Sequence, residues 1–411
     1  MRAQRCAVCQ LPLLASASAG VINATTGFVF LMMQSLDARR ADAATLEPAL
    51  TALREQTLES FANLRRALGG RLDIGYAEDV NPPLWELGHV GWFEEFWIAR
   101  NSQRHLAARA SVEAARAAAL LPGADALYDS SHVAHPLRWH LRLPDARRTE
   151  RYLSQVRERT LALLRDAEDS DDALYFFRLV LMHEAMHHEA GLMIAQGQGW
   201  PLTDAAPAAT PPRRELEVAG ATLRVGDDDG GFAFDNELGA HDVEIATFAI
   251  DNAPIAWRDL LPYFEAGGAL PRHVVRDDAY EHGFKRAAFG RWLALELDAP
   301  AVHLSAHDAQ AWCAWAGRRL PSEHEWTLAQ QQLGADFVFG EVWEWTASAF
   351  APWPGFTPHP YRDYSAPWFD GRPVLKGGSF ATLPFMKHPR YRNFFQPGRN
   401  DVFSGLRSCA V

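Results

Sequence analysis

The sequence predicts a two-domain α+β protein, in which a bundle of four long helices precedes a loop-rich domain of short strands and few helices. The length of 411 residues is too great for one ordinary hydrophobic core. The amino-acid composition also changes at residues 200–215, a stretch rich in Pro, Ala and Thr that is typical of a linker. We therefore expect a disordered or mis-assigned extension at 1–40, the bundle at 41–199, this linker, and a second domain at 216–411.

The beginning of the chain differs from the rest, because it is apolar, rich in small residues and without periodicity. Arg2 and Arg5 precede a mildly apolar run, as in a signal peptide, but Pro12 breaks the run. We expect an over-long start or a disordered extension, and we find no stretch of about 20 apolar residues that could span a membrane. Cys6 and Cys9 form a lone C-x-x-C, and with only four Cys in all we expect no disulfide framework and a cytoplasmic location.

The overall composition is that of a globular protein with an acidic balance. Hydrophobic residues make up 48% of the chain and charged residues 22%. The formal net charge of -11 argues against nucleic acid and anionic membranes as partners. Fourteen Trp suit aromatic-lined pockets, although large cores also use Trp.

Four helices are expected in the first domain because apolar residues recur there at helical spacing among charged ones. Thr149 is the expected N-terminal cap of the third helix. A further helix is expected near 110–120, inside an otherwise irregular stretch. Such helices suggest a bundle, whose core is a common place for metal sites. The four long helices are expected at 44–69, 83–100, 149–168 and 172–197.

The second domain is expected to be an α+β unit with much irregular structure. Its short β-like runs, clearest at 221–225 and 241–245, alternate with turns rich in Gly, Asp and Pro. One good helix is expected at 305–317, and the remainder is aromatic and rich in loops.

A histidine pair on the fourth helix is the main candidate for chemistry. His183 and His187 are four residues apart, so both rings project from one helix face and can share a metal ion. His89, on the second helix, is the natural third ligand, although a lone His among aromatic residues is more often part of a core. Three neutral imidazoles leave open positions on a divalent ion, which suits either zinc hydrolysis or ferrous oxygen chemistry.

Two other classes of function stay open on these residues. His183-Glu184-Ala185-Met186-His187 fits the H-E-x-x-H pattern of zinc hydrolases, with Glu184 as general base, but no third ligand follows at the expected spacing. A non-catalytic ligand-binding module is the alternative of a different class, since fold does not fix function. The run Tyr391–Arg399 combines an amide, two rings and an Arg in a loop, which suits the recognition of a polar small molecule.

These motifs together resemble the ergothioneine-synthase family of non-haem iron enzymes, which includes the selenium-using selenoneine synthases. The resemblance covers residues from about 45 to the end of the chain. It implies a DinB-like four-helix bundle followed by a formylglycine-generating-enzyme-type domain, which has a C-type-lectin-like fold. The motifs that carry it are Leu87-Gly88-His89 with Trp92-Phe93-Glu94, His183-x-x-x-His187-x-Glu189, Gly231–Glu237, Arg318–Trp326, Val342–Thr346 and Phe403–Arg407.

The resemblance also implies the cofactor, the substrates and the roles of single residues. The implied cofactor is Fe(II), the implied oxidant is O2, and the implied substrates are hercynine, the trimethyl betaine of histidine, and a selenium or sulfur donor. Rings near a quaternary ammonium have a physical rationale in cation–π attraction. The implied iron ligands are His89, His183 and His187; Asn393 and Phe394 would hold hercynine, Arg399 the donor, and Tyr361 or Tyr364 would be the catalytic Tyr.

Two departures from the family pattern bear on the donor. Phe395 stands where relatives that use γ-glutamylcysteine can carry Asp, and Met186 replaces a polar Gln. Both changes make the donor side more apolar, so we expect a selenosugar, with cysteine or γ-glutamylcysteine as the sulfur alternatives. Acceptors for the N–H groups of the ligand rings are expected too, and Glu94 and Glu189 are the candidates.

Overall fold

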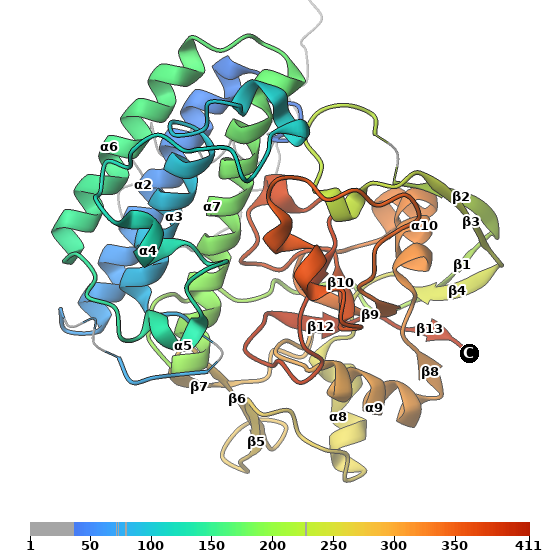
Figure 1. The fold of residues 1–411 in the computed structure, drawn as a ribbon. Helices are drawn as coiled ribbons and strands as arrows, with labels where there is room; N and C mark the ends of the chain where they lie inside the picture. Colours follow the sequence, from blue (N-terminus) through green and yellow to red (C-terminus); the bar gives the residue numbers. More distant parts are fainter. Residues whose placement is uncertain (1–36, 71, 73, 79, 227) are drawn as a thin grey trace, which may run out of the picture.

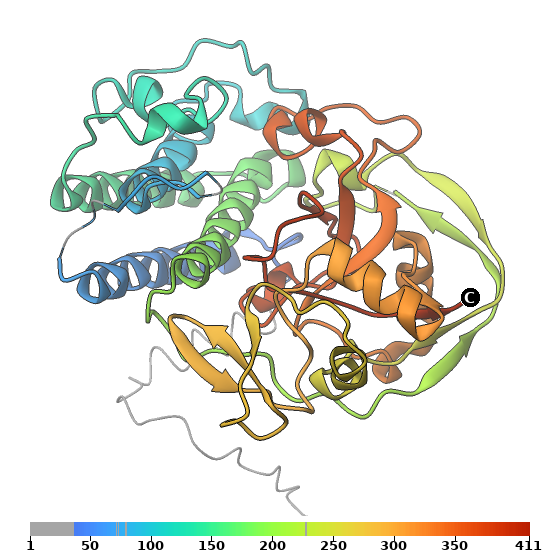
Figure 2. The ribbon, with the colours of Figure 1, turned by 90° about the horizontal axis from the view of Figure 1, so that it is seen from below.

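The computed structural model describes residues 37–70, 72, 74–78, 80–226 and 228–411, and the expectations for residues 1–36, including Cys6 and Cys9, lie outside it. A bundle of long helices lies beside a domain of short sheets and loops (Figure 1), and the view from below shows the same two-part arrangement (Figure 2). Residues 37–40 correct the expected extension at 1–40. Ala38 and Arg39 are buried, and the Arg39 guanidinium binds both carboxylate oxygens of Glu237 at 2.6 and 2.8 Å.

The bundle contains the four long helices that the sequence predicts. The third helix is capped by Asp145, whose side chain accepts the N–H of Arg148, and not by Thr149, which is buried inside the first turn. The N-terminal caps of the first and fourth helices are Asp42 and Ser170. The bounds are Ala43–Ala67 for α2, Pro83–Trp97 for α3, Ala146–Arg165 for α6 and Asp171–Gln198 for α7, with short helices at Arg104–Arg109 (η1), Ala124–Tyr128 (α4) and His135–Arg138 (α5).

The helix expected near residues 110–120 does not form. The main chain there donates to partners outside the segment: the N–H of Ala117 to the carbonyl of Arg100 at 3.1 Å, and that of Leu120 to the Glu95 carboxylate at 2.7 Å. These tertiary hydrogen bonds replace the i to i−4 ladder, and they outweigh the helix propensity of an Ala-rich stretch. Within the described residues, every helix is too short or too polar to cross a lipid bilayer.

The second domain has two four-stranded sheets and two smaller ones. Their orders are β1-β4-β13-β8, β11-β10-β9-β12, β5-β6-β7 and the hairpin β2-β3. Most neighbouring strands are antiparallel, but β12 pairs with β9 in parallel. The strands are Glu215–Val218 (β1), Ala221–Val225 (β2), His241–Ile245 (β3), Phe248–Asp251 (β4), Val274–Arg276 (β5), Phe284–Ala288 (β6), Arg291–Ala294 (β7), Arg318–Arg319 (β8), Trp343–Ala349 (β9), Pro373–Lys376 (β10), Asn393–Phe394 (β11), Ser404–Leu406 (β12) and Cys409–Ala410 (β13).

Three α-helices and several 3-10 turns pack around these sheets. The helix expected at 305–317 is present, and Ser305 caps it in a reciprocal arrangement with Asp308. Cys313 and Cys409 are buried free thiols. The helices are Trp257–Glu265 (α8), Ala306–Ala316 (α9) and Glu323–Leu333 (α10), with 3-10 turns at Asp235–Glu237 (η2), Gly334–Asp336 (η3), Arg362–Tyr364 (η4), Ala366–Trp368 (η5) and Pro384–Met386 (η6).

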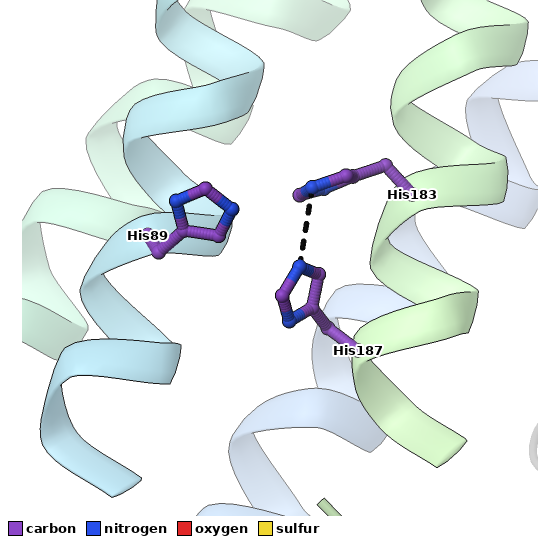
Figure 3. A group of neighbouring side chains, drawn as sticks. All are labelled: His89, His183 and His187. Atoms are coloured by element: carbon purple, nitrogen blue, oxygen red, sulfur yellow. Dashed lines mark hydrogen bonds between the residues drawn. The ribbon is translucent and has the colours of Figure 1, made fainter. Parts of the chain in front are cut away.

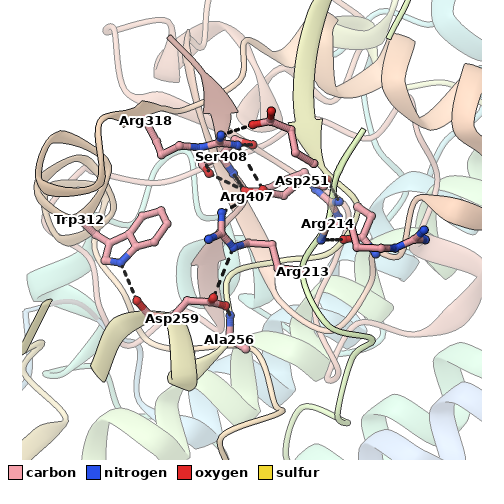
Figure 4. A network of polar contacts seen from close by, with 11 residues as sticks. Arg213, Arg214, Asp251, Ala256, Asp259, Trp312, Arg318, Arg407 and Ser408 are labelled. Atoms are coloured by element: carbon pink, nitrogen blue, oxygen red, sulfur yellow. Dashed lines mark hydrogen bonds and ion pairs between the residues drawn. The ribbon is translucent and has the colours of Figure 1, made fainter. Parts of the chain in front are cut away.

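A polar network fastens the end of the linker and the end of the chain to strand β4 (Figure 4). The Asp251 carboxylate, which is fully buried, accepts from Arg213, Arg318 and the main chain of Ser408 at 3.1–3.3 Å. The Arg407 side chain donates to the Asp251 carbonyl at 2.7 Å and to the Glu344 carboxylate of β9. The Phe403–Arg407 motif therefore holds the sheets of the second domain together.

Helix α7 joins the two domains through Glu189. This buried carboxylate accepts from the Trp343 indole at 2.8 Å and from the hydroxyls of Ser379 and Thr382 at 2.6 and 2.8 Å. The three donors come from the second domain, and His187 is two residues before Glu189 on the same helix. This contact fastens α7 to the second domain, and His187 of the same helix lines the cavity between them.

Candidate metal centre

Three histidines meet in the interior of the bundle (Figure 3). His89 projects from α3, and His183 and His187 project from α7. One ligand nitrogen from each of the three lies within 4.8 Å of the others, and the Nε2 atoms of His183 and His187 are 3.2 Å apart. The spacing of four residues on α7 thus gives the shared helix face that the sequence predicts.

Hydrogen bonds at the far side of two rings fix which nitrogen faces the centre. His89 Nδ1 lies 2.8 Å from the carbonyl oxygen of Tyr128, and His187 Nδ1 contacts a carboxylate oxygen of Glu86. Each Nδ1 therefore carries the proton, which leaves the Nε2 lone pair of both rings directed at the cluster. Such outer partners orient ligand rings in metal sites generally.

Burial keeps two of the three rings neutral. Burial, together with the neighbouring His187, lowers the pKa of His89 to about 3, and the same causes lower the pKa of His183 well below its ordinary value. Burial alone would raise the pKa of Glu86, but the His187 ring beside it lowers that pKa to about 2. A metal ion binds imidazole only in its neutral form, so the low pKa values of His89 and His183 favour metal binding.

Aromatic rings cover the cluster. The Phe93 ring stacks on His183 with centroids 3.5 Å apart, and the Trp85 ring stacks on His89 at 4.8 Å. These rings lock the imidazole rotamers and exclude water from that side. Three convergent imidazole nitrogens, two of them on rings held by hydrogen bonds from behind, fit a divalent transition-metal ion with positions left open for substrates.

Glu184 cannot serve as the general base that a zinc hydrolase would need. Glu184 lies on another face of α7 and its carboxylate binds Arg54 at 2.8 and 3.0 Å and Arg157 at 2.6 Å. These guanidinium groups oppose the effect of burial and lower the pKa of Glu184 to about 2. A carboxylate held by two cations and turned away from the histidines is a poor base, so the H-E-x-x-H interpretation is wrong.

A cavity of about 370 Å³ lies between α7 and the second domain, directly beside His187. This volume suits a small-molecule site. The sequence-predicted residues outside the histidine cluster all line it: Met186 from α7, and Tyr361, Tyr364, Asn393, Phe394, Phe395 and Arg399 from the second domain. Residues more than 200 positions apart in the chain are thereby brought to one place, and their individual roles are taken up below.

The two candidate tyrosines differ in their contacts. The Tyr361 ring meets His183 edge-on with centroids 5.8 Å apart, so it lies beside the histidine cluster. The Tyr364 hydroxyl donates to the Tyr391 hydroxyl at 2.8 Å, farther along the cavity wall. Burial raises the pKa of both Tyr361 and Tyr364 above the ordinary value for Tyr, so both phenols keep their protons at neutral pH.

The opposite wall combines rings with paired charges. Phe394 stacks on Phe350 at 4.1 Å, and the Arg399 guanidinium lies over the Phe395 ring at 5.3 Å. Arg399 binds Asp401 through two hydrogen bonds of 2.6 and 2.5 Å. The second Arg of the cavity, Arg372, binds both oxygens of Asp370 at 2.9 and 2.8 Å.

The acceptor behind His187 differs from the two carboxylates that the sequence favours. Glu94 belongs to the Arg54–Arg157 cluster, and Glu189 binds the second domain, so neither accepts from a ligand ring. Glu86 is the acceptor, three residues before His89 on the same face of α3. The E-x-x-H spacing, which recurs in metal sites of helical bundles, is the signal that could have found it.

Comparison with known proteins agrees with both halves of the fold. Residues 43–190 match the model of the DinB superfamily, and residues 202–337 and 330–410 match that of the sulfatase-modifying factor enzyme 1-like domain. The fold and the site therefore define a two-domain class, in which a DinB-type bundle with a histidine cluster is fused to a sulfatase-modifying-factor type domain. The predicted two-domain α+β architecture is confirmed.

Three relatives make the class more specific. The hercynine oxygenase of Mycolicibacterium smegmatis is 30% identical over an alignment of 435 positions, gaps included, which covers 88% of this chain and 98% of that protein. The hercynine oxygenase of Mycobacterium tuberculosis is 30% identical over 396 residues, covering 80% of this chain and 90% of that protein. The ergothioneine biosynthesis protein 1 of Schizosaccharomyces pombe is 26% identical over 210 residues, covering 43% and 27%. The chain belongs to the hercynine oxygenase family of enzymes.

Proposed function

We propose that the protein uses Fe(II) and O2 to form a carbon–selenium bond at the imidazole C2 of hercynine, with a selenosugar as donor. The single observation that carries the proposal is the convergence of three imidazoles beside a cavity at the domain interface. The names of the similar enzymes support hercynine as the substrate. His89, His183 and His187 would hold the iron, which when bound supplies the acidity of the donor and the redox chemistry of O2.

The overall reaction balances with O2 as the only oxidant. The C–H bond at C2 of hercynine and the Se–H bond of the donor break, and a C–Se bond forms between them. Both hydrogens leave with one oxygen atom as water, and the other oxygen atom is carried by selenium in the product. A sulfur donor would give a sulfoxide by the same balance.

The aromatic wall of the cavity suits the trimethylammonium group of hercynine. The rings of Tyr364, Tyr391 and Phe394 line the cavity together, with Tyr364 and Phe394 centroids 5.2 Å apart. Faces of aromatic rings attract quaternary ammonium groups. Asn393, which lies among these rings, offers its amide to the polar part of the same substrate.

The donor side of the cavity suits a neutral molecule. Its two guanidinium groups, Arg372 and Arg399, already bind Asp370 and Asp401 through paired hydrogen bonds. Met186 and Phe395 add apolar surface in place of polar groups. A donor with two carboxylates, such as γ-glutamylcysteine, would compete with those aspartates for the cations, whereas the hydroxyls of a sugar need no net charge to compensate.

Tyr361 is the residue that we assign to proton transfer. Its ring is adjacent to His183 and its hydroxyl keeps a proton at neutral pH, so the Oη atom can donate to a group formed in the cavity. Tyr364 is bound to Tyr391, which suits a role in shaping the hercynine pocket. Tyr361→Phe should therefore lower kcat more than it raises KM, and Tyr364→Phe should mainly raise KM for hercynine.

The test is a donor comparison. Anaerobic protein is loaded with Fe(II), hercynine and O2 are added, and a selenosugar, cysteine and γ-glutamylcysteine are offered separately, with products read by mass spectrometry. A selenium adduct of hercynine from the selenosugar alone supports the proposal. A sulfoxide adduct from a thiol would move the protein to ergothioneine-type synthesis, and Phe395→Asp should then favour γ-glutamylcysteine further. No adduct from any donor would overturn the assignment of hercynine.

A further inference from the structure

A second, narrower cavity reaches the histidine cluster from within the bundle. It lies among α2, α3 and α7 and has a volume of about 80 Å³. Glu86, His187 and Ile194 line both this cavity and the large one at the domain interface, so these three side chains separate the two spaces. The narrow cavity is lined mainly by apolar side chains: Phe61, Leu64, Pro83, Leu87, Val90, Leu192, Ile194 and Leu202.

The size and lining of this cavity restrict what it can hold. It is far smaller than the interface cavity of about 370 Å³, so neither hercynine nor a sugar fits it. An apolar lining offers few hydrogen bonds, and enclosed apolar cavities in proteins take up small apolar ligands such as xenon. A small, uncharged, apolar molecule is the occupant that this chemistry selects.

Gly191, in the C-terminal third of α7, adds no side chain to the cavity. A Cβ built on Gly191 would meet nothing within 4 Å, although the residue lines the cavity. The glycines of α3 are different, because a Cβ on Gly88 would come within 2.2 Å of the Tyr128 ring and one on Gly91 within 2.7 Å of Leu153. Packing therefore explains Gly88 and Gly91 but not Gly191, although Gly inside a helix is less favourable than Ala.

We propose that the narrow apolar cavity is the route by which O2 reaches the histidine cluster. This inference rests on the proposed use of O2. Hercynine and the donor would fill the interface cavity during the reaction, which leaves O2 in need of a separate entrance. The cavity ends at His187, and partly exposed residues such as Ser60, Leu192 and Leu202 form its outer part.

Water is the competing occupant. Thr57 Oγ1 and His188 Nδ1 are buried and have no hydrogen-bond partner in the described part of the chain, and both residues line the cavity. A water molecule bound to both atoms would make this a hydrated pocket rather than a gas route. Xenon binding to a crystal distinguishes a dry cavity, which takes up the gas, from one that is filled with water.

Xenon is the probe for the cavity itself, and it needs neither iron nor turnover. Crystals of the full chain are pressurised with xenon, and we expect a xenon atom between α2, α3 and α7 near Gly191. The same site should be empty of xenon in Gly191→Leu, because the added side chain enters the cavity. An ordered water on Thr57 and His188, with no xenon bound, would overturn the proposal.

Oxygen kinetics test the route. Gly191→Leu should lower kcat/KM for O2 several-fold while iron content and the KM for hercynine stay at the wild-type values. Gly191→Ala is the matched control, since it makes the same change to the helix backbone but leaves most of the cavity free. Unchanged kcat/KM for O2 in Gly191→Leu, in an enzyme that still forms the hercynine adduct, would overturn the route. Absence of any adduct in the wild type would instead count against the proposed function.

Discussion

Helices α3 and α7 carry two buried polar clusters that differ in how their groups are paired. In the first, which we term the ion-pair cluster, Glu94 and Glu184 alternate with Arg54 and Arg157, and all four side chains are at most 6% exposed. Each carboxylate binds both cations, so no charge is left without a partner. The ion-pair cluster fastens α2, α3, α6 and α7 to one another.

The histidine cluster has the opposite character. His89, His183 and His187 face one another with no cation or carboxylate between them, and a cavity lies next to them. His183 and Glu184 are adjacent in sequence, yet one belongs to each cluster because they project from different faces of α7. A saturated cluster stabilises a fold, and a cluster of convergent, unprotonated donors is suited to bind something else.

Removal of a histidine should have the largest effect on activity. His183→Ala is expected to lose both iron and hercynine turnover, because two imidazoles bind a divalent ion far more weakly than three. The fold should persist, since the ring contributes stacking on Phe93 but no ion pair. Iron content by mass spectrometry and thermal unfolding by circular dichroism check this. Full iron occupancy in His183→Ala would show that His183 is not an iron ligand.

Disruption of the ion-pair cluster should have the largest effect on stability. Arg157→Ala leaves Glu94 and Glu184 short of a cation in a buried place, which costs about 3–5 kcal/mol of unfolding free energy. The folded fraction should still bind iron with the wild-type stoichiometry. Urea unfolding measures the loss. Arg165→Ala is the control on the same helix, because its ion pair with Glu47 is exposed to solvent and should contribute little.

Glu86 shares features of both clusters, since it is a partly buried carboxylate whose partner is a histidine. Glu86→Gln keeps an acceptor for the His187 Nδ1–H but removes its charge, so we expect about 10–100-fold weaker iron binding. Competition with a chromophoric chelator measures this affinity, and the unfolding midpoint of the iron-free protein should change little. Equal iron affinity in the variant and the wild type would show that the carboxylate does not tune the site.

These two clusters also show which parts of the site can be predicted from the sequence and which cannot. The His183–His187 spacing is local, and the apolar and aromatic residues around His89 make an inward-facing ring predictable from the local pattern alone. The partner of each carboxylate is not predictable in this way, because Arg54 and Arg157 lie 130 and 27 positions from Glu184 in the chain. The direction of Glu94 away from the histidines depends on those distant cations.

Predictions from local sequence signals were also wrong where tertiary contacts outweighed the local preference. Thr149 has the chemistry of a helix cap, but Asp145 precedes it by one turn and takes that role. The helix near 110–120 is favoured by propensity and lost to hydrogen bonds with Arg100 and Glu95. The residues of the interface cavity were predictable only from a resemblance in motifs, since neither composition nor spacing brings Met186 next to Phe395.

Asp235 extends the comparison to a buried carboxylate with no cation. Its Oδ2 atom accepts from the Ser365 hydroxyl at 2.8 Å and from the main-chain N–H of His359 at 3.1 Å, and no ion pair to it is found among the described residues. Burial raises the pKa of Asp235 to about 6, whereas the cations of the ion-pair cluster lower the pKa of Glu184 to about 2. The same burial thus gives opposite shifts, depending on whether a cation is present.

This difference predicts a pH dependence for Asp235→Asn. Below about pH 4 the carboxyl is protonated in both the folded and the unfolded chain, so its ionisation contributes nothing there. Between about pH 4 and 6 the folded state holds the proton more strongly, so the wild type loses stability as pH rises and stays at the lower level above pH 6.

An Asn at position 235 has no charge to bury and keeps an oxygen for both donors. Asp235→Asn should therefore be more stable than the wild type at pH 8, by on the order of 1 kcal/mol, and the gain should shrink toward pH 4. Urea unfolding at the two pH values measures it, and an equal gain at both would show that the carboxylate is not disfavoured by burial.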